Sequence, residues 1–141
     1  MQNIGGAFAH DHRRLEQALE ASVAHVQAGR WDAATDAFAG FRRGIERHMA
    51  VEEQVLFPAV ENGVETPLTA ILRKGHRDLR VFFDEIEDAL NARDAEEYRR
   101  IAASMRALLE RHDEKEEAEL YPAAQARLGT DAAAVAAKLD E

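Results

Sequence analysis

The chain contains no cysteine among its 141 residues, and only three prolines. The lack of thiols excludes disulfide frameworks, thiolate zinc sites, iron–sulfur clusters and cysteine nucleophiles. No apolar run approaches the length of a membrane span, and the N-terminal segment lacks the apolar stretch of a signal peptide. A formal net charge of −9 argues against unspecific binding to nucleic acid or to an anionic membrane. We therefore expect a cytoplasmic protein that binds neither nucleic acid nor membrane.

Clusters of β-branched residues are almost absent as well, and no segment has the alternation of a strand. Alanine, glutamate, leucine and arginine dominate, and the apolar residues recur at helical spacing. The sequence predicts an all-α protein. At this length we expect one domain covering residues 1–141.

Start and stop signals divide the chain into four long helices and a short one. Thr66-Pro67 and Asp94 are typical helix starts. The helices are predicted at about 5–28, 32–61, 67–91 and, after Asp94, to about 127, followed by a tail helix at about 131–139. Short connections favour antiparallel neighbours, so we predict an up-down-up-down four-helix bundle over about 5–127 with a short C-terminal helix. The tail helix either caps the bundle or mediates a dimer.

A pattern of histidine and glutamate occurs twice, with the copies 64 residues apart. In each copy two histidines are separated by 36 positions, and a glutamate follows the second histidine by four. The residues of the pattern are His12, His48 and Glu52 in the first half and His76, His112 and Glu116 in the second. All six are candidate metal ligands, because imidazoles and carboxylates in such regular duplicate suit a site between paired helices.

The four histidines are predicted to lie at one level of the bundle and to face its interior. Each is sixteen residues from the predicted hairpin turn, which at about 1.5 Å of rise per residue places all four roughly 24 Å from the turns. Each also lies on the apolar stripe of its helix, beside residues such as Phe8, Ile45, Leu79 and Leu109. Buried imidazoles and carboxylates need partners, which are either hydrogen bonds within a polar core or metal ions. A metal site is the simpler interpretation.

The donor set favours a pair of metal ions. A glutamate four residues after a histidine is about 40° away around the helix and one turn along, so both side chains can reach one ion. Four nitrogens with two shared carboxylates suit iron better than magnesium or calcium. A ferritin-like site would need Glu-x-x-His motifs and more carboxylates, and a single zinc ion would use only part of this set.

The chain resembles the hemerythrin-like family of HHE cation-binding domains. The resemblance rests on the duplicated histidine and glutamate pattern and on two similar segments, HMAVEEQVLFPA (48–59) and HDEKEEAELYPA (112–123). The resemblance covers about 5–127. It implies a four-helix bundle that holds two iron ions bridged by an oxo or hydroxo group. It also implies that His12, His48, His76 and His112 are terminal ligands and that Glu52 and Glu116 bridge the ions.

Two positions depart from the oxygen carriers of that family. Carriers have a further histidine four residues after the third one, where this chain has Arg80, and the matching position in the first half is Glu16. Glu16 either fills a coordination position, pairs with Arg80, or points outward. Carriers also place an aspartate five residues after the last histidine, which makes Glu117 a rival to Glu116, although the helical angle favours Glu116.

Several nearby residues are expected to have ordinary roles. Glu53 and Glu117 lie about 140° from the histidines of their own helices, so a surface position is the default. His10 points nearly opposite to His12 and is expected to be solvated. Tyr121 is treated as a packing residue, with a ligand role as the less favoured alternative.

The sequence and the resemblance together predict a non-haem di-iron protein that binds or senses oxygen or a related small oxidant. One alternative is a di-iron enzyme that degrades peroxide or nitric oxide, and another is an iron-handling protein. The expected partners are a small diatomic ligand or peroxide and, for a sensor, a separate protein.

Overall fold

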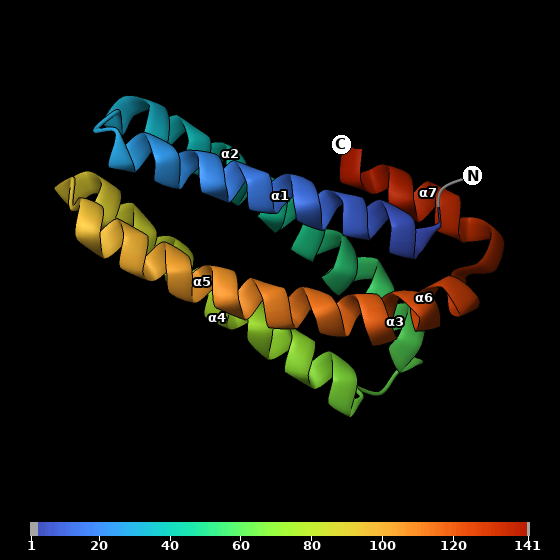
Figure 1. Ribbon diagram of the computed structural model, residues 1–141. Coiled ribbons are helices and arrows are strands. Elements are labelled where there is room, and N and C mark those ends of the chain that lie inside the picture. Colours follow the sequence, from blue (N-terminus) through green and yellow to red (C-terminus); the bar gives the residue numbers. More distant parts are fainter. Residues whose placement is uncertain (1–2, 141) are drawn as a thin grey trace.

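The computed structural model describes residues 3–140, and this part of the chain is helical almost throughout, without strands (Figure 1). The all-α prediction is confirmed. The elements in chain order are α1 (Ile4–Gln27), α2 (Trp31–Val51), a π-helical turn (Glu52–Leu56), α3 (Phe57–Glu61), α4 (Pro67–Ala92), α5 (Ala95–Lys115), a second π-helical turn (Glu116–Leu120), α6 (Tyr121–Leu128), a 3-10 turn (Gly129–Asp131), α7 (Ala132–Ala137) and a last 3-10 turn (Lys138–Asp140).

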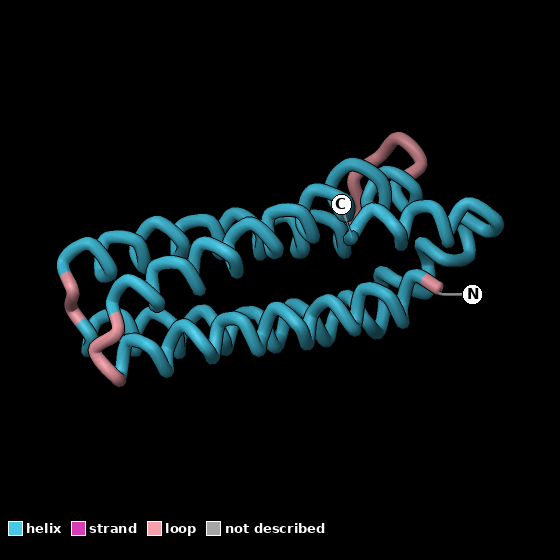
Figure 2. The backbone as a smooth tube through the Cα atoms, turned by 90° about the horizontal axis from the view of Figure 1, so that it is seen from above, coloured by secondary structure: helices cyan, strands magenta, loops and turns pink. Residues whose placement is uncertain are grey.

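Four long helical segments pack side by side as two antiparallel hairpins, α1 with α2 and α4 with α5. The turns of both hairpins lie at the same end of the bundle, and the connection between α3 and α4 lies toward the other end (Figures 1 and 2). This is the expected four-helix bundle. Within the part of the chain that the structure describes, no helix is both long and apolar enough to cross a membrane.

Side-chain caps fix where three of the four long helices begin, namely α1, α4 and α5. The Asn3 side chain accepts a hydrogen bond from the Gly6 amide, and the Asp94 side chain accepts one from the Glu97 amide. Thr66 and Thr69 form a reciprocal capping box at the start of α4. Each cap supplies a partner for backbone N–H groups that the first helical turn leaves free. The helix starts read from the sequence therefore agree with the structure to within a residue or two.

The helical segments that begin with α2 and α5 each change from α to π geometry shortly before a proline. The Phe57 amide donates to the Glu52 carbonyl, and the Tyr121 amide donates to the Glu116 carbonyl. A proline lacks an N–H, and its ring collides with the carbonyl four residues earlier in a regular α-helix. A wider turn before Pro58 and Pro122 relieves that collision without ending the helix.

Two apolar clusters enclose a polar layer in the bundle. The larger one lies toward the hairpin turns and includes Phe38, Phe41 and Phe83. The smaller one includes Phe8 and Leu72 and also contains buried residues of the C-terminal segment. These are Ala132, Val135, Ala136 and Leu139. The tail helix therefore packs on the bundle end beside α1, as the capping alternative expected.

Candidate metal centre

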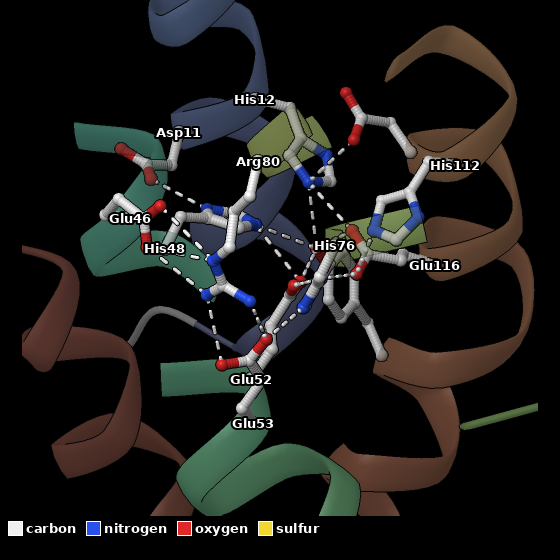
Figure 3. A network of polar contacts seen from close by, with 12 residues as sticks. Asp11, His12, Glu46, His48, Glu52, Glu53, His76, Arg80, His112 and Glu116 are labelled. Atoms are coloured by element: carbon white, nitrogen blue, oxygen red, sulfur yellow. Dashed lines mark hydrogen bonds and ion pairs between the residues drawn. The ribbon is translucent and has the colours of Figure 1, made fainter. Parts of the chain in front are cut away.

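The six residues of the duplicated pattern converge in the polar layer between the two apolar clusters. All six are buried, and Figure 3 shows them pointing toward one another from helices of both hairpins. His12 lies on α1, His48 on α2, His76 on α4 and His112 on α5, whereas Glu52 and Glu116 begin the two π-helical turns. Ring centroids 4.5 Å apart for His12 and His48 and 5.0 Å apart for His76 and His112 place the two histidines of each hairpin at one level. Glu52, in contact with both His48 and His76, joins the two pairs, in agreement with the predicted common level.

The donor atoms form two groups that share both carboxylates. The first metal group is His12, His48, Glu52 and Glu116, and the second metal group is Glu52, His76, His112 and Glu116. In each group one ligand atom from every residue lies within 4.8 Å of the others. Such spacing suits one cation in each group.

The two carboxylates divide their oxygens between the groups. Glu52 places Oε2 at 3.1 Å from His48 Nε2 and Oε1 at 3.0 Å from His76 Nε2. Glu116 places Oε1 at 3.1 Å from His12 Nε2 and Oε2 at 3.0 Å from His112 Nε2. A carboxylate with one oxygen in each group is placed to bridge two ions.

Two atoms of the second metal group test whether the residues fit a metal. His112 Nε2 and Glu116 Oε2 are buried and lie 3.0 Å apart, but neither makes a hydrogen bond of regular geometry among the described residues. A buried polar atom without a well-formed hydrogen bond is costly, and native structures rarely leave one. Both atoms face the same space, so a cation between them would satisfy both. The site fits a metal better than it fits a closed hydrogen-bonded core.

Comparison with known families gives the same interpretation. The family of the hemerythrin HHE cation binding domain matches residues 4–124, which is most of the chain. The chain belongs to this family. No curated protein and no solved structure matched it. The match and the buried His/Glu cluster together make this hemerythrin-like chain a metal-binding protein.

Carboxylates behind three of the four histidines hold the outer nitrogen of each ring. Asp11 lies 2.8 Å from His48 Nδ1, Glu53 lies 2.7 Å from His76 Nδ1, and Glu117 lies 2.9 Å from His12 Nδ1. Such contacts fix the tautomer and the ring orientation of a metal-binding histidine and raise its basicity. The hemerythrin-like centre is thus supported from outside the ligand set.

This arrangement corrects the expectation that Glu53 and Glu117 are ordinary surface carboxylates. Both are partly solvent-accessible, but each bonds a histidine of the opposite hairpin rather than of its own helix. The helical angle between each glutamate and the histidine of its own helix was therefore the wrong criterion for its role. Glu116, and not Glu117, points into the centre, as its helical angle indicated. Asp11 was missed by the sequence reasoning, although its position next to His12 could have drawn attention to it.

Arg80 belongs to this supporting network and not to the ligand set. Its guanidinium donates to Glu53 at 3.0 Å and to Glu46 at 3.2 Å. The possible pairing of Arg80 with Glu16 is not observed. Because Glu53 in turn holds His76, Arg80 anchors the carboxylate that orients this ring (Figure 3). Burial opposes the charged form of Glu53, but His76 and Arg80 outweigh it and lower the pKa of Glu53 to about 2.

The fourth histidine is supported differently. Gly75, the counterpart of Asp11 in the second half, presses its backbone against His112, and a Cβ atom there would lie 2.5 Å from His112 Nδ1. A surface pocket of about 230 Å³ runs beside this contact and is lined by Gly75, Leu108 and His112 among others. His112 is thus the histidine nearest to solvent in the hemerythrin-like centre, with 8% of its surface exposed.

Two further groups face the first metal group. The Tyr121 hydroxyl donates to Glu52 Oε2 at 2.7 Å and is fully buried. Asp113 Oδ1 lies 3.3 Å from His12 Nε2, and burial raises the pKa of Asp113 to about 7. The sequence reasoning favoured a packing role for Tyr121 over a ligand role and did not consider Asp113.

Three of the four histidines, His12, His48 and His76, have raised pKa values beside the carboxylates of the centre. Burial disfavours the charged imidazoles, but the neighbouring carboxylates outweigh burial and raise the pKa of His12 to about 9, of His48 to about 10 and of His76 to about 11. Burial likewise opposes ionisation of Glu116, yet the surrounding histidines lower its pKa well below the usual range. A metal ion that binds these three nitrogens has to displace the protons that the raised pKa values favour.

Proposed function

We propose that the protein is a non-haem di-iron protein that binds or senses oxygen or a related small oxidant in the cytoplasm. The observation that carries the proposal is the pair of metal groups sharing Glu52 and Glu116, each carboxylate with one oxygen in each group. A donor set of four imidazoles and two carboxylates is rich in nitrogen, which favours iron over magnesium or calcium.

The proposed ligands are His12, His48, His76 and His112 as terminal donors and Glu52 and Glu116 as bridges. When bound, the iron pair supplies the redox chemistry. The protein supplies the surroundings: Asp11, Glu53 and Glu117 hold three imidazole rings, and the apolar clusters on both sides keep bulk water from the centre.

An enzyme acting on peroxide or nitric oxide is the second candidate. The observation that favours it is Arg80, which stands where the oxygen carriers have an additional histidine and which bonds carboxylates instead. The second metal group then offers four protein residues, two histidines and two shared carboxylates. An iron ion that prefers six ligands has positions open for reactive chemistry in such a site.

Oxygen titration distinguishes the two candidates. The protein is loaded with ferrous iron in the absence of air, oxygen is admitted and then removed, and near-ultraviolet absorption of the iron centre is followed throughout. Bands that appear and then reverse support binding or sensing. Bands that appear once and persist, together with multiple turnovers of peroxide or nitric oxide, support the enzyme. Failure to take up iron contradicts both.

A further inference from the structure

The Tyr121 hydroxyl lies at the centre of the first metal group. It is 2.7 Å from Glu52 Oε2, 3.0 Å from Glu116 Oε1, 3.0 Å from His12 Nε2 and 3.2 Å from His48 Nε2. The side chain is fully buried. A phenol donates one hydrogen bond and accepts at most two, so the four polar atoms around this hydroxyl exceed its hydrogen-bonding capacity.

These distances have a simple interpretation in coordination geometry. Each vertex of an octahedral complex has four cis neighbours, and with metal–ligand bonds near 2.1 Å cis ligands lie about 3.0 Å apart. The hydroxyl oxygen has four proposed ligand atoms at such distances, all from the first metal group. Two pairs within that group, His12 with Glu116 and His48 with Glu52, are also 3.1 Å apart.

We propose that the phenolate oxygen of Tyr121 is a ligand of the metal ion in the first metal group. The inference rests on the proposed di-iron site and adds a fifth protein residue to one of its two ions. On coordination the phenol releases its proton to solvent and the oxygen forms a bond to the cation, as coordinating groups beside a metal do.

The second metal group has no residue that matches the Tyr121 hydroxyl. The position 64 residues before Tyr121 is Phe57, which also follows a π-helical turn and stacks on His76 with ring centroids 5.4 Å apart. Phe57 fills the matching place without an oxygen. The duplicated pattern therefore gives two unequal ions, one with a phenolate and one without.

The chain offers a matched control, because it contains only two tyrosines. Tyr98 is buried in the larger apolar cluster, where its hydroxyl donates to Ser22 at 2.6 Å. Neither Tyr98 nor Ser22 contacts the candidate ligands. Tyr98→Phe thus removes a buried phenol outside the centre, and Tyr121→Phe removes the one inside it.

The test is the colour of the ferric protein. A phenolate bound to ferric iron gives a charge-transfer band in the visible region, and resonance Raman excitation in that band enhances tyrosine ring modes. After loading with ferrous iron and oxidation, we expect the band in the unchanged protein and in Tyr98→Phe. We expect its complete loss in Tyr121→Phe, with the near-ultraviolet absorption of the iron centre retained.

Incorporation of ring-deuterated tyrosine keeps the test valid if Tyr121→Phe fails to fold, because the enhanced modes of the unchanged protein must then shift. Iron bound without a visible phenolate band, or a band that survives in Tyr121→Phe, overturns the inference and leaves the di-iron proposal standing. Failure of the unchanged protein to bind iron overturns both, and metal analysis of the same samples separates the two cases.

Discussion

At the scale of single residues, three of the four histidines use both ring nitrogens. His12, His48 and His76 each point Nε2 into the centre and Nδ1 toward a carboxylate behind them. The carboxylate fixes the ring before a metal arrives, so less conformational entropy is lost on binding. The supporting carboxylates are therefore part of the centre although they touch no proposed metal position.

Asp11→Asn tests this support. The amide can still accept a hydrogen bond from His48, but it removes the negative charge that favours the Nδ1–H form and raises ring basicity. We expect iron affinity to fall by about 10- to 100-fold, as for other outer partners of metal-binding histidines. Asp36→Asn, on an exposed position of α2, is the control and should leave affinity unchanged. Equal affinities in a competition titration with a chelator would contradict the supporting role of Asp11.

The six proposed ligands could be located from spacing alone, but their supports could not. Spacing within one helix says which residues share a face, and that located Glu52 and Glu116 beside their histidines. Glu53 and Asp11 bond histidines of other helices, so their roles depend on the lateral placement of helices, which no single-helix angle contains. The same limitation applied to Glu117.

At the scale of helical elements, the π-helical turns explain why Tyr121 was underestimated. In a regular α-helix Tyr121 would be about 140° from Glu116, on a different face. The wider turn over Glu116–Leu120 joins residues five apart by a hydrogen bond and brings them toward one face. Pro122 lies just after this turn, and the local response to the proline includes a change from α to π geometry.

The close approach of α4 to α5 at Gly75 is a second property of the elements. Gly75→Ala would place a Cβ atom 2.5 Å from His112 Nδ1 and must displace the ring or the helix. We expect reduced iron binding and a lower melting temperature for the iron-loaded protein, even though alanine is the better helix former by about 1 kcal/mol.

Gly40→Ala is the matched control on α2. A Cβ atom there would meet only the flexible Arg43 side chain, at 3.7 Å. This substitution should keep full iron binding and raise the melting temperature slightly because of helix propensity. Thermal unfolding and metal analysis of both variants measure the difference, and identical behaviour would contradict the role assigned to Gly75.

At the scale of the whole molecule, two hairpins with equally spaced histidines define the centre. The predicted height of each histidine is its number of residues from the hairpin turn. An error in the position of a turn therefore changes the predicted height of both histidines of that hairpin together. That is why the bundle and the level of the site were predictable. The tail segment was not, because its apolar residues suited either the bundle end or a second chain, and only packing beside α1 decides the former.

Metal binding and folding should be linked through pH. Burial disfavours the charged forms of His12, His48 and His76, but the neighbouring carboxylates raise their pKa values to about 9, about 10 and about 11, above the unfolded value of about 6.5. The stability from these raised pKa values is fully present below about pH 6.5 and is lost as pH rises through the folded values. Metal-bound imidazoles are neutral, so iron affinity should rise over the same range.

Thermal unfolding of metal-free and iron-loaded protein between about pH 6.5 and about pH 9.5 measures this linkage. The melting temperature of the metal-free form should fall as pH rises, and the difference between the two forms should widen. A constant difference across the range would show that the histidines do not exchange protons for metal.

The most direct test of the di-iron account is the iron content of the protein and of two ligand variants. Each is loaded with ferrous iron without air, unbound metal is removed, and iron per chain is measured. We predict two iron ions per chain in the unchanged protein and a sharp reduction in His48→Ala and in His112→Ala. A single ion in the unchanged protein, or a full pair retained in both variants, would contradict the account.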